Sequence, residues 1–200
     1  MASPAQVVFE VSTTSEQMNS WEGDGQAPQI TMNGEPFGAL EQPGLPSGFQ
    51  VLALDATGDL SNPDDIMINE YVYLQNDGGQ WGSTYEWMYS QMIGMLLNAG
   101  NYEHQLLFLA SFGLDEDMPP SNDGLQFLLE RGAGPGLQTW ETSANAGSQE
   151  GAWVSSPASY ILIGNLGYAY GQGTEAYVFN DGEPAPATVS ATFQNNIPPT

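Results

Sequence analysis

Short apolar runs bounded by turn residues dominate the hydrophobic pattern of this chain. Residues 49–55, 105–111 and 159–164 are apolar over most of a strand's length, which is typical of strands covered on both faces. Stretches rich in β-branched or alternating apolar residues predict further strands at residues 6–12, 29–32, 66–74 and 188–193. The alternation in the last of these favours a half-buried edge strand. Asn33-Gly34 predicts a tight turn after the second strand.

Two segments have helical periodicity instead. The first is 84–98, where apolar residues recur at spacings near 3.6, at Trp87, Met88, Met92, Met95 and Leu96. The second is 121–131, which Gly132 ends as a C-cap and which places Arg131 near the negative end of the helix dipole. Residues 132–158, rich in Gly, Ser, Thr, Asn and Ala, are predicted to form an open connection.

These elements predict one mixed α+β domain over residues 1–200, with a core of about 6–193, two main helices and a mixed sheet. The length fits a single domain with a substantial core. We expect the following residues in that core: Leu52, Leu54, Leu107, Leu109, Ile161 and Ile163.

The amino-acid composition excludes several classes of function. Hydrophobic residues make up 40% of the 200 residues, so the chain does not resemble a disordered acidic tail. It has 24 Asp and Glu but no lysine and one arginine, for a formal net charge of −23. This balance argues against binding nucleic acid or anionic membranes and excludes lysine Schiff-base chemistry. With no cysteine, disulfides and Cys-ligated zinc are excluded. We see neither a signal peptide nor a membrane span.

The order of these motifs resembles the PANDER-like domain family, also known as the interleukin-like EMT inducer family. The resemblance extends from residue 6 to 193. The first motifs that carry it are a strand, an Asn-Gly turn, and a segment from Gly48 to Gly58 that includes Asp55 and Thr57. An amphipathic helix follows, then an apolar strand with an acidic loop after it, and then a helix that ends in Gly-Ala. The last motif is the apolar strand 159–164 with a Gly-rich tail that reaches Glu175.

This resemblance implies a compact β-sandwich-like domain that carries helices and that binds without catalysing a reaction. Relatives in that family include cytokine-like proteins, a carbohydrate-binding stem domain, and domains of cell-surface and viral proteins. Because this chain lacks the cysteines and signal peptide of the secreted animal members, the resemblance favours a microbial or phage module.

Few residues suggest catalysis or metal binding. His104 is the only histidine, and nothing near it looks like a nucleophile elbow. The acidic runs Asp64-Asp65 and Asp115-Glu116-Asp117 offer oxygen ligands for Ca²⁺, with Asp115 and Asp117 as candidates, but neither has EF-hand spacing. A glycosidase carboxylate pair is a further alternative. The segment 167–173 contains GxxxGxG rather than a dinucleotide fingerprint, so we predict no cofactor.

Aromatic residues in polar or Gly-rich segments are the main candidates for binding. Their rings stack on the apolar faces of sugars, or anchor a protein partner, while neighbouring amides and carboxylates form hydrogen bonds. For any single ring, packing under a loop or between subunits remains the alternative. The candidates are Trp21, Trp81, Trp140, Trp153, Tyr168 and Tyr170.

The sequence therefore supports two functional hypotheses. The first is a structural or interaction protein, either a virion component such as a head-decoration or fibre-associated protein, or a microbial surface protein. Its partners are other proteins of an assembly, with a homo-oligomer as one arrangement. The second is a lectin-like module that binds neutral glycans. Both readings place the protein on a virion or outside the cell.

Overall fold

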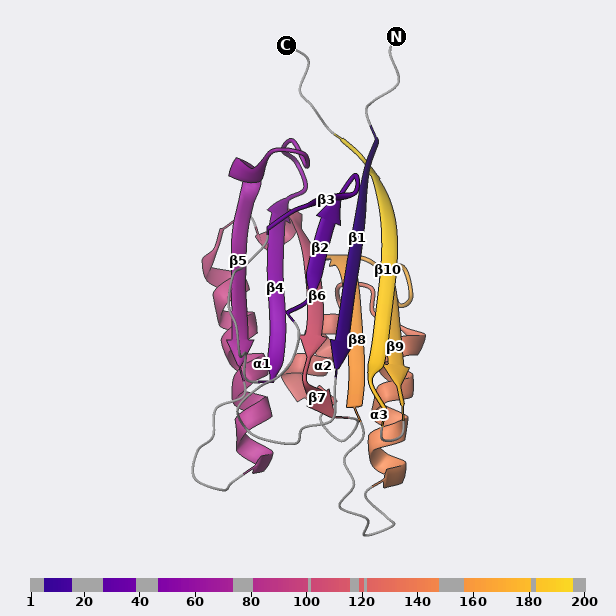
Figure 1. The fold of residues 1–200 in the computed structure, drawn as a ribbon. Coiled ribbons are helices and arrows are strands. Elements are labelled where there is room, and N and C mark those ends of the chain that lie inside the picture. The colour runs from indigo at the N-terminus through magenta and orange to yellow at the C-terminus, as the bar shows by residue number, and fades with distance from the viewer. Residues whose placement is uncertain are drawn as a thin grey trace.

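The described part of the chain forms three layers in the computed structural model. It comprises residues 6–15, 27–38, 47–73, 81–100, 102–115, 119–120, 122–147, 157–180 and 183–195. A four-stranded sheet packs on a larger six-stranded sheet, and helices cover the opposite face of the larger sheet (Figure 1). Two apolar cores fill the two spaces between these layers.

The smaller sheet has the strand order β10-β1-β2-β3, and every neighbouring pair is antiparallel. A two-residue turn at Asn33-Gly34 joins β2 to β3, and both residues have positive φ, as a type I′ turn requires. The predicted turn and edge strand are therefore confirmed. The strand bounds are β1 Gln6–Ser15, β2 Gln29–Met32, β3 Glu35–Pro36 and β10 Ala185–Gln194.

The larger sheet is antiparallel throughout, so the prediction of a mixed sheet is wrong. It runs from β5 through β4 and β6 to β8, which also pairs with β7 and β9. The strands predicted at 49–55, 66–74, 105–111 and 159–164 are confirmed as β4, β5, β6 and β8, whereas β9 was not predicted. The bounds are β4 Gly48–Asp55, β5 Ile66–Tyr73, β6 Gln105–Phe112, β7 Leu114–Asp115, β8 Pro157–Asn165 and β9 Thr174–Phe179.

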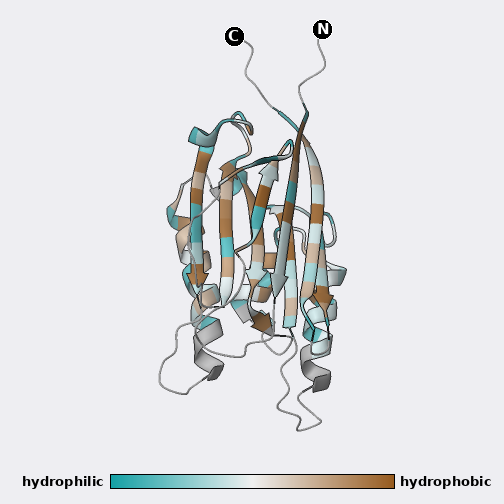
Figure 2. Ribbon diagram, viewed as in Figure 1, coloured by the Kyte–Doolittle hydropathy of each residue, from teal (hydrophilic) through white to brown (hydrophobic). Residues whose placement is uncertain are grey.

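Alternation along the inner strands explains why they are apolar at most positions. In β4, Phe49, Val51 and Ala53 face the helices, while Leu52 and Leu54 face the smaller sheet. The residues of β6 and β8 divide between the two cores in the same way. The outer strands β1 and β10 bury only one face, and Figure 2 shows their hydrophobic and hydrophilic bands alternating. All six residues predicted for the core are buried.

Three helices lie in the described part of the chain, not the two that were predicted. The helix expected over 84–98 begins three residues earlier, and the one expected over 121–131 is slightly shorter. The third lies within residues 132–158, where we expected an open connection. The bounds are α1 Trp81–Asn98, α2 Asn122–Leu129 and α3 Pro135–Gly147, with 3-10 turns η1 Pro63–Asp65 and η2 Tyr102–His104.

Arg131 follows α2 and donates from Nη1 to the Phe127 carbonyl at 3.2 Å, which confirms its predicted place at the carboxyl end of that helix. Gly132 has a φ of +88°, which confirms the glycine C-cap. The whole is a sheet-dominated α+β fold whose two sheets form a sandwich. No described helix has the length and apolar character needed to cross a membrane.

Candidate functional site

Several predicted site residues lie where the structure gives no side-chain position. Trp21, Trp153 and Asp117 are outside the described residues. Trp81 is the first residue of α1 and Asp115 the last of β7, but their side chains are also outside the description. The structure therefore does not test these five as contacts for a ligand, partner or metal.

Trp140 is not the loop residue that the sequence suggested. It lies in α3, and none of its surface is exposed (0%). Its ring stacks on Tyr177, with ring centroids 5.7 Å apart, and contacts Tyr160 at 5.5 Å. The apolar contacts that this large ring makes fix α3 against the sheet. Trp140 is therefore a packing residue and offers no face to a ligand.

Tyr168 and Tyr170 do lie on the predicted loop after β8. Tyr168 is half-buried, whereas Tyr170 is 55% exposed and its hydroxyl lies 2.9 Å from the side-chain oxygen of Gln138. The glycines of this loop allow it to pack closely on the chain after α2. Gly173 donates its N–H to the Gly132 carbonyl at 2.9 Å, and a Cβ on Gly132 would lie 2.6 Å from the Gly173 nitrogen. The glycines of this segment therefore serve to pack the loop against the chain that follows α2.

The acidic and histidine candidates are not brought together in the described part of the chain. No group of three or more His, Asp or Glu side chains is placed there to hold a metal ion. Asp65 accepts the backbone N–H of Asp59, so it closes its own loop. The carboxylate of Asp59 accepts hydrogen bonds from the Ser61 hydroxyl and the Asn195 amide, which lower its pKa. His104 is exposed in η2, ahead of β6.

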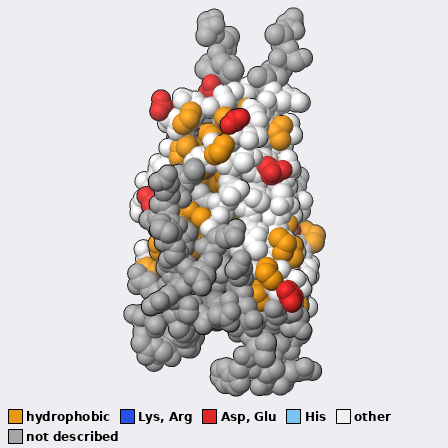
Figure 3. All heavy atoms as spheres, in the orientation of Figure 1, with side chains coloured by type: hydrophobic (Ala, Val, Ile, Leu, Met, Phe, Trp, Pro, Cys, Tyr) orange, Lys and Arg blue, Asp and Glu red, His pale blue; other side chains and the backbone are white. Residues whose placement is uncertain are grey.

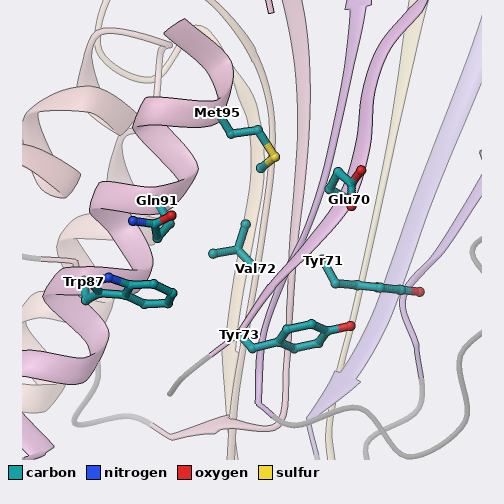
Figure 4. A pocket seen from close by; sticks show the side chains of 7 residues that line it. All are labelled: Glu70, Tyr71, Val72, Tyr73, Trp87, Gln91 and Met95. Atoms are coloured by element: carbon teal, nitrogen blue, oxygen red, sulfur yellow. The ribbon is translucent and has the colours of Figure 1, made fainter. Parts of the chain in front are cut away.

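Within the described residues, a groove between α1 and β5 is the strongest candidate site. It encloses about 210 Å³ (Figure 4). Trp87, Gln91 and Met95 line one wall; they are spaced four residues apart, so they lie on one side of α1. The other wall is part of β5, from which Val72 points toward the helix (Figure 4). The exposed Glu70 also lines the groove. Below, this is called the α1–β5 groove.

The groove exists because α1 has a wider apolar stripe than it buries. Met88, Met92 and Leu96 are completely buried against the larger sheet. Trp87 and Met95 are one residue back along the helix, at the flank of that stripe. As a result Trp87 remains 38% exposed, one of the few large apolar side chains in the described part of the chain that is exposed.

Two tyrosines of β5, Tyr71 and Tyr73, also belong to the lining of the groove, although their rings lie on the other side of the strand. Figure 4 shows Tyr71 and Tyr73 projecting away from α1. Both meet Phe112 of β6 edge-on, with ring centroids 5.5 and 6.3 Å apart. Partial burial raises the pKa of both phenols, and for Tyr73 the nearby charge of Glu70 raises the pKa further. Both tyrosines are therefore neutral at physiological pH, and the groove's charge comes from Glu70.

The surface around this groove carries no lysine or arginine side chain. The sequence has no lysine, and its single arginine, Arg131, is 0% exposed. The guanidinium of Arg131 lies 3.5 Å from the centroid of the Phe127 ring, in the interior. On the face drawn in Figure 3, the described atoms show acidic side chains and apolar patches but no basic side chain. The potential at the groove is therefore negative.

Neither protein-family models nor curated proteins match this chain. The resemblance to the PANDER-like family thus remains an expectation from the sequence. Sequence reasoning missed the groove because it assigned Trp87 and Met95 to a single buried helix face. The signal was present in the second stripe at 87, 91 and 95, beside the buried stripe at 88, 92 and 96.

Proposed function

We propose that this protein acts by binding and not by catalysis, as an interaction protein of a larger assembly, and that the α1–β5 groove contacts its partner. The observation that carries the proposal is a tryptophan ring, 38% exposed, in an apolar groove on a surface without lysine or arginine side chains. Exposed aromatic rings in pockets are typical anchors of protein interfaces. The resemblance found in the sequence favours a virion component or a microbial surface protein as the setting.

The size of the groove limits what it takes. Pockets for whole drug-sized ligands enclose about 300–1,000 Å³. At about 210 Å³, the α1–β5 groove has room for a single side chain or a single sugar ring. A larger partner would therefore place one group in the groove and spread its other contacts over the surrounding surface.

A lectin-like function is the second candidate, and the composition of the groove favours it specifically. The Trp87 ring supplies a flat apolar face, and Gln91 and Glu70 add an amide and a carboxylate to the lining of the same groove. These are the groups that stack on a sugar ring and bond its hydroxyls. A neutral glycan also feels no repulsion from a chain with net charge −23.

Comparing three proteins tests the proposal: the wild type, Trp87→Ala, and Tyr170→Ala as a control that removes an exposed ring outside the groove. Each is screened on a glycan array and used to capture structural proteins from its native source; captured proteins are purified and rebound. Loss of binding in Trp87→Ala alone is the expected result. The proposal is wrong if correctly folded Trp87→Ala binds every identified partner as tightly as the wild type.

A further inference from the structure

We infer that the α1–β5 groove takes a lysine or arginine side chain from a basic segment of a different protein. This inference rests on the proposed function and specifies the partner's chemistry. It combines three observations: the groove has an apolar wall, an exposed carboxylate lines it, and the surrounding surface has no lysine or arginine side chain.

The lining matches the two parts of such a side chain. Lysine and arginine place their methylene stems along apolar surface and keep the charged head in contact with water. Trp87, Met95 and Val72 supply that apolar surface. The carboxylate of Glu70 supplies the opposite charge, and the face of an indole ring attracts a cation.

Long-range charge favours the same occupant. With a formal net charge of −23 and its only arginine buried, the protein attracts a basic partner from any direction and repels an acidic one. This attraction alone would not select a site. The groove provides one because an exposed aromatic ring and an exposed carboxylate both line it.

A second copy of this chain does not supply that side chain. It has no lysine, and its one arginine is completely buried, which leaves His104 as its only basic side chain at the surface. The sequence hypothesis of a homo-oligomer therefore does not extend to this groove. The occupant has to come from another protein.

The test uses three amidated peptides of the form acetyl-(Gly-Ser-Xaa-Ser)₄, where Xaa is lysine, norleucine or glutamine. Norleucine keeps an aliphatic stem without the charge, and glutamine keeps polarity without the charge. Titration calorimetry at low and physiological salt measures each peptide against the wild-type protein. We expect the lysine peptide to bind at least about tenfold more tightly than either neutral peptide, and to weaken with salt.

Matched variants locate the binding. Glu70→Gln and Glu183→Gln each remove one exposed negative charge, but only the first lies in the groove. We expect Glu70→Gln to weaken the lysine peptide about three- to tenfold and Trp87→Ala about tenfold. Glu183→Gln and Tyr170→Ala should change its affinity less than about twofold.

Each other outcome overturns a specific claim. Equal weakening by Glu70→Gln and Glu183→Gln means that net charge attracts the peptide without a site. If the lysine and norleucine peptides bind equally and only Trp87→Ala matters, the groove binds but not through a cation, so the proposed function survives without this inference. A lysine-peptide dissociation constant above about 1 mM also overturns the inference. Neutral glycans that bind in the groove in preference to the lysine peptide overturn it in favour of the lectin.

Discussion

Leu107→Ala tests whether the larger sheet is the central layer of the protein. Leu107 lies in β6, which pairs with β4 on one side and β8 on the other. Its side chain is completely buried in the core between the sheet and the helices. Removing it leaves a hole in a layer that is held in place from both sides, so we expect little relaxation around it.

The expected cost follows from these surroundings. Leucine to alanine removes three carbons, and at about 0.8 kcal/mol for each buried group the transfer contribution alone is about 2.4 kcal/mol. The cavity left between paired strands adds to this, which gives a loss in the free energy of unfolding of about 3–5 kcal/mol. With an m-value of about 2 kcal/mol/M, the urea midpoint falls by about 1.5–2.5 M.

Leu97→Ala is the matched control, because Leu97 lies on α1 with 52% of its surface exposed. The same chemical change there should alter stability by less than about 0.5 kcal/mol. Urea unfolding followed by circular dichroism, with equal m-values, compares the two variants directly. The assignment of β6 to the centre of the fold is refuted if Leu107→Ala costs less than about 1 kcal/mol, or no more than Leu97→Ala.

Four further outcomes follow from the structure. Trypsin should leave the native protein intact, because the only trypsin site in the sequence, Arg131, is buried. Electrophoresis after partial unfolding should show cleavage at this one site. Rapid cleavage of the native protein would contradict the burial of Arg131. Hydrogen bonds lower the pKa of Asp59 from 3.8. The stability that its carboxylate contributes should therefore be complete above pH 3.8 and be lost as the pH falls through the lowered pKa. An Asp59→Asn variant should lack this part of the loss of stability in acid. Burial and Glu175 raise the pKa of Tyr160 well above 10.0, so stability should fall as pH rises above 10, and less steeply in Tyr160→Phe. Gly164→Ala should cost about 1–3 kcal/mol in urea unfolding, because its Cβ would lie 2.2 Å from the Arg131 carbonyl oxygen, and an unchanged midpoint would refute that contact.

The sequence predicted the inner sheet well for a physical reason. Strands buried on both faces are apolar at most positions, so β4, β6 and β8 stand out from the polar chain around them. The turn at Asn33-Gly34 was predictable because two consecutive positive φ values favour those residue types. Such signals are local and need no knowledge of distant contacts.

Helix α3 was missed because much of what stabilises it comes from distant residues. Its own sequence consists largely of small and polar residues, which favour an open connection. The carboxylate of Glu175 accepts the backbone N–H groups of Gly134 and Gly136 at 2.9 and 2.8 Å, and so satisfies the start of the helix. Trp140 then stacks on Tyr177 of β9. A pattern read along the chain does not reveal partners that lie about forty residues away.

The candidate site was only half visible in the sequence. The stripe at Trp87, Gln91 and Met95 can be read from helical spacing, but its opposite wall cannot, because the sequence does not say which strand lies beside α1. The sequence also shows a single arginine without showing that it is buried. Because Arg131 is buried, no lysine or arginine side chain lies at the surface. This is why the charge of the surface indicates a basic partner.

Mapping the lysine peptide by NMR shows whether the α1–β5 groove binds a basic side chain. In a titration of ¹⁵N-labelled protein, we expect the largest amide shift changes at Glu70, Val72 and Gln91, with a change in the indole N–H signal of Trp87. These changes should saturate together at one dissociation constant. Largest changes in the loop at residues 167–173, or small changes spread over the acidic surface with none in the groove, would contradict binding in the groove.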